Sequence, residues 1–306
     1  MTKPDLLPGI QVLERGWLSA NNILFTDGPE TVMIDSGYCT HAPQTLSLVE
    51  TTLGGRPLDL LLNTHLHSDH CGGNAALQAR YPDVRTWIPP GQASQVTQWD
   101  PAALTYVPTG QLCPQFKFSG TLQAGSTLRF GAHDWQVHAA AGHDPHSFVF
   151  FEPENGILIS ADALWENGFG VVFPELEGTD AFAEVAATLD MIDSLKPKTV
   201  IPGHGPIFAY SPEILGRARQ RLDYFAKNPR KHAHHAVKVL LKFKLLETQR
   251  QSMEDLIDWA DATPYFLQIR KIFFPELSIR SWIETLCAEL VAAGVARTEA
   301  SYILNA

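Results

Sequence analysis

Residues 63–74, NTHLHSDHCGGN, hold an unusual concentration of ionisable side chains. Four of them stand within six positions: His65, His67, Asp69 and His70. The preceding residues 58–62, LDLLL, form a short apolar run that is typical of a buried strand, and a pair of glycines follows the motif. We therefore expect the four side chains in a loop at the end of a buried strand, where sites are commonly built.

The residue types in this motif indicate a metal site. Imidazole suits zinc and related transition metals, and carboxylate is a harder companion ligand. Four donors exceed what one catalytic metal takes from a single loop, because an open zinc site uses three protein ligands and a water. Three further candidates each stand just past a predicted strand: His143, Asp162 and His204. Donors from several strand ends predict a metal centre at the edge of a sheet.

Four short motifs resemble, in their order and spacing, those of the metallo-β-lactamase fold hydrolases, and especially their glyoxalase II-like branch. They are HLHSDH, GHDPHS, SADAL and PGHGP, and the resemblance covers residues 10–210. It implies an α/β fold, in which an αββα sandwich carries two metal ions at one edge.

The resemblance also implies a role for each donor. The first metal would be held by His65, His67 and His143, the second by Asp69, His70 and His204, and Asp162 would bridge them. The nucleophile would be a hydroxide between two divalent ions, because two cations lower the pKa of bound water. We expect zinc, although iron or manganese also suits these ligands. Asp69 would also orient the hydroxide as a catalytic residue. His146 receives no role, because relatives place this histidine four positions after the first and here it stands three after it.

The first two-thirds of the chain alternate strand and helix patterns. A hairpin is predicted for residues 22–26 and 31–35, because Asp27 and Gly28 form a turn between two apolar runs. A short helix is predicted over 74–80, and a longer one over 180–195, from its apolar spacing and its stop before a proline. Further strands are predicted at residues 84–88, 135–139, 147–151, 157–160 and 199–201.

The tail from residue 211 differs in composition. Residues 1–210 carry 9 Lys+Arg and 22 Asp+Glu, a net charge of −13, whereas residues 211–306 carry 14 and 11, a net charge of +3. We therefore expect a catalytic domain at 1–210 and a C-terminal helical domain at 211–306. Within the tail, residues 237–244 read as a basic amphipathic helix. A helix over 281–295 followed by a short apolar run resembles a winged-helix-like end, of a kind found in endoribonuclease relatives.

Aromatic residues closely follow the bridging position. Residues 165–174, WENGFGVVFP, suit a flap that lines an apolar pocket, although packing of the aromatics in the core fits equally. From this segment we expect substrate contacts by Trp165, Phe169 and Phe173. His41 follows residues 35–39, which resemble the loop beside the metals in the family, and it is a further candidate for substrate contact.

Three reactions fit these motifs. Resemblance to glyoxalase II favours hydrolysis of a small ester-like substrate, preferably a thioester, while lactones, β-lactams and phosphoesters stay open. The same metals would serve a phosphodiesterase or endoribonuclease, in which the basic tail would bind nucleic acid in a strongly salt-dependent way. The third alternative is a mononuclear iron oxidoreductase like the persulfide dioxygenases, and the full set of seven donors counts against it.

Composition narrows the partners and the compartment. A net charge of −10 argues against a wholly nucleic-acid-binding protein, so a small-molecule substrate is favoured over nucleic acid. No stretch approaches the ~20 apolar residues that span a bilayer, so no membrane partner is expected, and the first residues lack a signal-peptide core. Four scattered cysteines without a CxxC pair favour a reducing, cytoplasmic compartment. A homodimer stays open.

Overall fold

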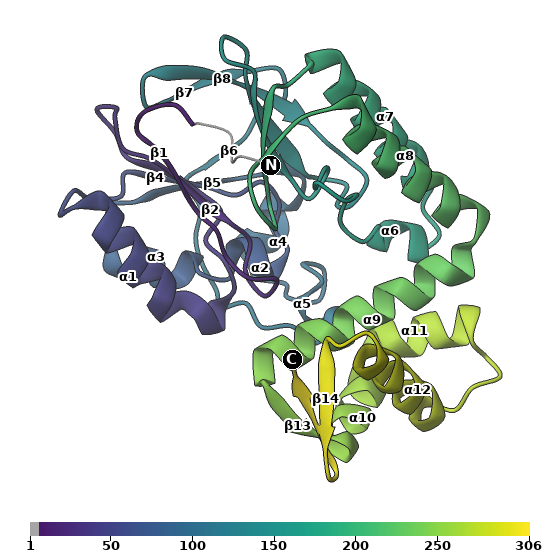
Figure 1. Cartoon of the computed structure of the whole chain (residues 1–306). Helices are drawn as coiled ribbons and strands as arrows, with labels where there is room; N and C mark the ends of the chain where they lie inside the picture. Colours follow the sequence, from purple (N-terminus) through teal and green to yellow (C-terminus); the bar gives the residue numbers. More distant parts are fainter. Residues whose placement is uncertain (1–5) are drawn as a thin grey trace. The chain divides into compact units, whose positions relative to one another are not determined.

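The computed structural model describes residues 6–306, which divide into two compact units (Figure 1). The first unit comprises the chain up to Leu104 and Leu112–Tyr224, and the second comprises Thr105–Gln111 and Phe225–Ala306. The division near residue 224 falls inside helix α8, Pro212–Lys227. The domain ranges expected from charge, 1–210 and 211–306, stay a prediction.

Two six-stranded sheets form the centre of the first unit. One sheet has the order β1-β2-β3-β4-β5-β6 and the other the order β12-β11-β10-β9-β8-β7. The strands of the first sheet are β1 Ile10–Leu13, β2 Asn22–Phe25, β3 Val32–Ile34, β4 Leu60–Leu62, β5 Arg85–Ile88 and β6 Gly120–Thr121. Those of the second are β7 Thr127–Phe130, β8 His133–Ala139, β9 Phe148–Glu152, β10 Ile157–Ala161, β11 Thr199–Pro202 and β12 Phe208–Ala209.

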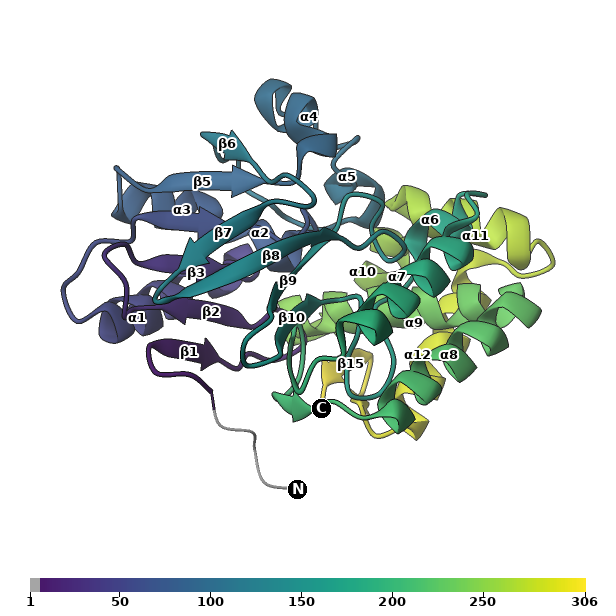
Figure 2. The same cartoon turned by 90° about the horizontal axis from the view of Figure 1, so that it is seen from above.

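Helices cover both outer faces of the paired sheets. Figures 1 and 2 show α1 and α3 on the side of the first sheet, and α7 and α8 on the side of the second. The helices of this unit, besides α8, are α1 Ala42–Leu53, α2 Ser68–Cys71, α3 Asn74–Arg80, α4 Ala93–Gln98, α6 Phe173–Leu176 and α7 Ala181–Leu195, with 3-10 turns η1 Cys39–His41 and η2 Pro90–Gln92. This arrangement confirms the predicted αββα sandwich.

Alternation along the strands explains the layers. Successive side chains of a strand point to opposite faces of its sheet. In β2, Ile23 and Phe25 belong to the core that also contains Trp135 and Phe150 of the second sheet. The intervening Leu24 instead packs in a second cluster with residues of α1 and α3. The first sheet is therefore apolar on both faces, which is why it is buried between helices and the second sheet.

The second unit is mostly helical. Its elements are α5 Tyr106–Thr109, α9 Pro229–Thr248, β13 Arg250–Ser252, α10 Met253–Ala262, α11 Pro264–Phe273, α12 Ile279–Ala292, β14 Ala296–Glu299 and β15 Tyr302–Asn305. The three strands form an antiparallel sheet in the order β13-β15-β14. Ser252 and Ser278 cap α10 and α12, since each hydroxyl accepts a backbone N–H three residues on. The predicted helix near the C-terminus is thus followed by a hairpin, and a helical C-terminal region is confirmed.

Every strand and helix predicted above is present, with ends within a few residues. The hairpin is β2–β3, the helix over 180–195 is α7, and the basic segment 237–244 lies inside α9. Before residue 211, the helices α1, α2, α4, α5 and α6 and the strands β1, β6, β7 and β12 were not predicted.

Candidate metal centre

The HLHSDH motif follows β4 and enters a short helix. His67 has an extended backbone at the N-cap of α2, whereas Asp69 and His70 lie within that four-residue helix. The expected loop is thus extended at His67 and helical at Asp69 and His70, and this change of backbone separates the two pairs of donors. His65, three residues after β4, and His70 in α2 are both fully buried.

The other three predicted donors follow strands of the second sheet. His143 comes after β8, Asp162 directly after β10, and His204 two residues after β11. Because β10 and β11 are parallel, Asp162 and His204 leave the sheet at the same edge. A register shift at the end of β10, with φ of +47° at Ala161, bends the chain immediately before Asp162.

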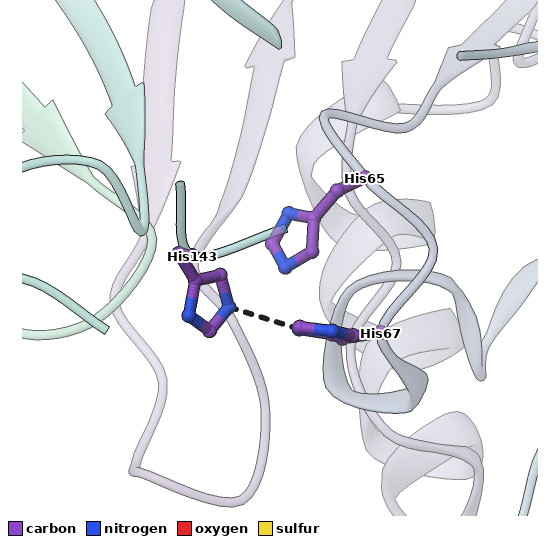
Figure 3. Close-up of side chains that lie close together, drawn as sticks. All are labelled: His65, His67 and His143. Carbon is purple, nitrogen blue, oxygen red and sulfur yellow. Dashed lines mark hydrogen bonds between the residues drawn. The ribbon is translucent and has the colours of Figure 1, made fainter. Parts of the chain in front are cut away.

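Seven predicted donors gather in one cluster. Three overlapping sets have donor atoms within 4.8 Å of one another: His65, His67 and His143; His65, His70 and Asp162; Asp69, His70 and His204. Figure 3 shows the three imidazoles of the first set turned toward one another, with His67 Nδ1 and His143 Nε2 2.9 Å apart. The carboxylate of Asp162 lies between the sets, 3.4 Å from His143 Nε2 and 3.9 Å from His204 Nε2.

Contacts behind the cluster fix which nitrogen of three of the imidazoles faces it. His143 Nδ1 bonds to the carbonyl oxygen of Val171 at 2.5 Å, and His70 Nδ1 lies 2.7 Å from Asp35 Oδ2. His65 Nδ1 lies 3.1 Å from the hydroxyl of Thr64. Within residues 6–306, Nε2 of His65 and of His70 is buried without a hydrogen-bond partner. Ligand histidines commonly show this arrangement, with one nitrogen anchored and the other left for a metal.

Burial keeps most of the imidazoles neutral. It lowers the pKa of His65 and of His67, and it lowers the pKa of His143 to about 4, assisted by the neighbouring His67. A histidine binds a metal only when its ring nitrogen carries no proton. At neutral pH these three side chains are therefore already in the form that a metal requires.

The carboxylates act in the opposite direction on His70. Burial alone lowers the pKa of His70, but the charges of Asp35, Asp162 and Asp69 outweigh burial and hold the pKa well above its usual value. For Asp162, burial alone would raise the pKa. The neighbouring His70 and His204 outweigh burial and hold this pKa well below its usual range. Ionised carboxylates, mostly neutral imidazoles and orphaned nitrogens together fit two transition-metal ions.

The cluster opens to solvent at His67 and Asp69. Their side chains are 17% and 16% exposed, whereas the other five donors are nearly buried. A substrate would therefore reach the cluster on this side.

The residues expected to contact substrate differ in how accessible they are and in how near they lie to the cluster. Phe173 lies beside the opening, with its ring edge-on to His67 at 6.1 Å, and Trp165 donates from Nε1 to Asp162 Oδ1 at 3.2 Å. Phe169 is only 1% exposed and packs under the guanidinium of Arg221, so its side chain offers no open surface. The alternative of core packing therefore applies to Phe169. His41 is partly buried, with Nδ1 2.9 Å from the hydroxyl of Ser19.

Two residues of the site were missed by the sequence reading. Asp35 contacts His70 as described, and its backbone has a φ of +57°. Trp17 stacks on the ring of His204, with centroids 5.4 Å apart. Asp35 was noted only as part of a loop, and nothing near Trp17 in the sequence links it to a donor 187 positions away.

Other histidines remain outside the cluster. The ring of His146 lies against Gly91, and its backbone N–H donates to Asp144 Oδ1 at 2.7 Å. His133 lies near Glu152 and Glu154, but Glu152 accepts backbone N–H groups of the β9–β10 turn. In α9, His234 bonds to Glu289 and not to the other histidines of that helix.

Curated relatives match different shares of this chain. A hydroxyacylglutathione hydrolase from Synechococcus sp. (strain JA-3-3Ab) is 30% identical over 174 residues, which cover 53% of this chain and 60% of the relative. An atrochrysone carboxyl ACP thioesterase from Aspergillus fumigatus is 25% identical over 251 residues, covering 80% of this chain and 49% of the relative. The chain thus spans about half to two-thirds of the length of the first curated relatives that it matches.

Solved structures share the fold. The metallo-beta-lactamase family protein TTHA1429 from Thermus thermophilus superposes with a TM-score of 0.57 at 18% identity, covering 99% of this chain and 100% of that chain. TTHA1623, crystallised in a di-iron-bound form, gives 0.53 at 30% identity, covering 68% and 96%. A family model described as "Metallo-beta-lactamase superfamily" matches residues 15–204, a range that contains all seven donors. The chain therefore belongs to the metallo-beta-lactamase superfamily.

Proposed function

We propose that the chain is a hydrolase that uses two metal ions to cleave a small ester-like substrate, preferably a thioester. The observation that carries this proposal is the set of three overlapping donor groups, which share His65 and His70. Relatives named hydroxyacylglutathione hydrolase and thioesterase support the choice of substrate class.

Each donor has a proposed role in this reaction. His65, His67 and His143 would hold one ion, Asp69, His70 and His204 the other, and Asp162 would lie between them. Bound there, the ions would supply Lewis acidity and lower the pKa of a coordinated water. Asp69, the most exposed carboxylate of the cluster, would hold that water in position by a hydrogen bond.

Metal identity follows less directly from the ligands, because geometry and availability select the metal more than ligand type does. Zinc suits a site of imidazole and carboxylate donors. TTHA1623 was crystallised with two iron ions, and this supports iron as the second candidate.

A small molecule is the proposed partner, and the cytoplasm is the proposed location. Within residues 6–306, no helix combines the length and apolar character needed to cross a bilayer. All four cysteines are free thiols, as a reducing compartment would keep them.

The test is hydrolysis of an acyl thioester and of a phosphodiester, measured side by side with metal content. Asp69→Asn keeps the shape of the side chain but removes its charge, so we expect thioester turnover to fall about 100-fold or more. Asp134→Asn is the matched control, because this aspartate is exposed and its carboxylate pairs with Arg129. Unchanged turnover in Asp69→Asn, with metal bound, would refute the assigned site. If only the phosphodiester is hydrolysed, phosphodiesters would replace thioesters as the proposed substrate class.

A further inference from the structure

We propose that Trp17 and Trp165 form an aromatic subsite that binds a flat apolar group of the substrate next to the bond that is cleaved. This inference rests on the hydrolase function proposed above and adds a feature of the substrate to it.

Trp17 is exposed although it is the largest kind of apolar side chain. It lies in the β1–β2 connection and is 56% exposed. Its indole lies nearly parallel to the imidazole of His204, with an interplanar angle of 13° and centroids 5.4 Å apart. One face of the indole therefore covers a donor of the cluster, while much of the side chain stays open to solvent.

Trp165 gives the subsite its second wall. Its ring meets Trp17 at 67° with centroids 5.2 Å apart, and it meets His204 at 80° with centroids 5.6 Å apart. The hydrogen bond from its Nε1 to Asp162 ties the ring to the carboxylate between the donor sets. Two indoles at a steep angle form a corner that adjoins the cluster directly.

The Trp17 wall is held in place by the loops that carry the donors. Ala20 N–H donates to the carbonyl of Asp69 at 2.9 Å, and Asn21 N–H donates to the carbonyl of Gly203 at 2.7 Å. The side chain of Asn21 donates further to the carbonyls of Pro202 and Gly205. The connection is thus fastened to the motif loops of both sheets.

The Trp165 wall is fastened independently. Its backbone N–H donates to the carbonyl of Gly168 at 2.7 Å, which closes a tight turn. Arg217 Nη2 donates to the carbonyl of Glu166 at 2.9 Å and holds the same turn. Since the backbone segments that carry both walls are fastened before any ligand arrives, binding would cost little ordering of the main chain.

The chemistry of the corner defines what it would take. Indole faces stack on flat apolar groups, and such pairs favour binding beyond the area that they bury. An aryl or conjugated group on either the acyl or the thiol side of a thioester has this shape. The shared requirement is a flat apolar group within one or two bonds of the reacting carbonyl.

The experiment compares kcat/KM for two pairs of thioesters. The acyl pair is the acetyl and benzoyl esters of N-acetylcysteamine, and the thiol pair is the acetyl esters of N-acetylcysteamine and of thiophenol. Trp17→Ala should lower the aryl-to-alkyl ratio of kcat/KM by roughly five- to tenfold in one pair, mainly through KM. Trp17→Phe should restore most of the ratio, and the pair that responds identifies the side of the substrate. Tyr224→Ala is the control, because it removes a comparably exposed aromatic from α8.

Equal losses for every thioester would indicate a merely structural role and overturn the proposal, as would an unchanged ratio in both pairs. If the wild-type protein hydrolyses no thioester, the proposed function fails and a second readout decides the subsite. This is calorimetric binding of the naphthylmethyl thioether of N-acetylcysteamine, which cannot be hydrolysed. Binding that Trp17→Ala weakens at least fivefold supports the subsite. Absence of binding to the wild-type protein, or equal binding to both, refutes it.

Discussion

At the scale of single residues, Asp35 is not a member of the donor cluster, but it contacts the donor His70 and affects its basicity. Its Oδ2 lies 2.7 Å from His70 Nδ1 and accepts the hydroxyl of Thr64, and its Oδ1 accepts the backbone N–H of Thr64. A carboxylate behind a ligand histidine fixes the ring and raises its basicity. The strained φ of +57° at Asp35 is held by this network of contacts.

The first prediction concerns proton release when metal binds. Burial alone lowers the pKa of His70, but Asp35, Asp162 and Asp69 hold it well above its usual value, so this ring keeps its proton more strongly than the other imidazoles and must lose it to become a ligand. The imidazoles of His65, His67 and His143, whose pKa values burial lowers, should release almost none. Calorimetry of zinc binding in two buffers of different ionisation enthalpy should therefore report a net release of protons.

A variant tests whether His70 is the source of the released proton. Asp35→Asn removes a charge that raises the pKa of His70, so it should release less proton and weaken metal binding by roughly 10- to 100-fold. Asp134→Asn, on the exposed β7–β8 hairpin, serves as the control. Equal proton release in wild type and Asp35→Asn would contradict the role given to His70.

The second prediction uses two glycines that border the donors. A Cβ on Gly170 would meet His143 Nδ1, and a Cβ on Gly203 would meet Asp162 Oδ1. Gly170→Ala and Gly203→Ala should therefore displace a ligand and lower metal affinity at least tenfold, measured by competition with a chelating dye. Gly216→Ala is the matched control, since its Cβ meets nothing within 4 Å in a helix and should stabilise by about 0.5–1 kcal/mol. Affinity like that of the control would argue against the assigned donors.

Residue types and spacing were sufficient to predict all seven members of the cluster. They were not sufficient for Asp35 or Trp17, because an aspartate and a tryptophan are common and their partners lie far along the chain. His70 is 35 positions from Asp35, and only the parallel pairing of β3 with β4 brings the two together.

At the scale of elements, the donors come from strand ends and their orientation comes from short irregular segments. The end of β10 shifts register before Asp162, and the segment after it closes a turn at Gly168. Apolar runs between turn residues made the short strands predictable. Helix α1 was not predicted, because Leu46, Val49 and Leu53 have helical spacing but are separated by serine and threonine, which are weaker helix formers.

The third prediction concerns Phe169 in the 165–174 segment. The sequence suggested a flap residue, so that its loss would raise KM. The buried ring predicts instead that Phe169→Ala lowers the free energy of unfolding by about 3 kcal/mol or more, measured by urea denaturation. Phe173→Ala should cost less stability, since that side chain is only partly buried. Full stability of Phe169→Ala together with a raised KM would restore the flap interpretation.

The fourth prediction concerns Cys287 in α12. Burial raises the pKa of this thiol to about 12, and the thiolate is the form that reacts. Iodoacetamide at pH 8 should therefore alkylate the partly exposed Cys39 and Cys113 well before Cys287, as peptide mass spectrometry would show. In urea all four cysteines should react alike. Early labelling of native Cys287 would show that α12 opens readily.

At the scale of the whole molecule, the basic side chains of the C-terminal region are less available for binding nucleic acid than the sequence suggested. Lys238 pairs with Glu289 at 3.1 Å, and Lys244 pairs with Glu247 at 2.8 Å. Lys242 donates to the carbonyl of Val295 and to the side chain of Asn305. The basic face of α9 thus stabilises its own unit, so the charge pattern that indicated nucleic acid has another explanation.

The fifth prediction follows for the nuclease alternative. Fluorescence anisotropy with a single-stranded RNA at about 0.15 M salt should detect no binding tighter than the non-specific range, about 10⁻⁴–10⁻⁶ M. Tight binding that falls steeply as salt rises would revive the phosphodiesterase interpretation. The matched variant for that outcome is Lys231→Gln, an exposed cation near the start of α9.

The chain enters the second unit twice. Thr105–Gln111 contributes α5 to it, and a Cβ on Gly110 would lie 2.8 Å from Trp259 Nε1 in α10, so this short piece is closely packed there. Charge and composition gave no sign of it, because only tertiary contacts distinguish seven residues from their neighbours. As a consequence, the second unit cannot be moved to another protein as one continuous segment. A recombination event or an engineered fusion that joins at a single point near residue 225 would carry over the C-terminal helices and leave behind the segment on which they pack.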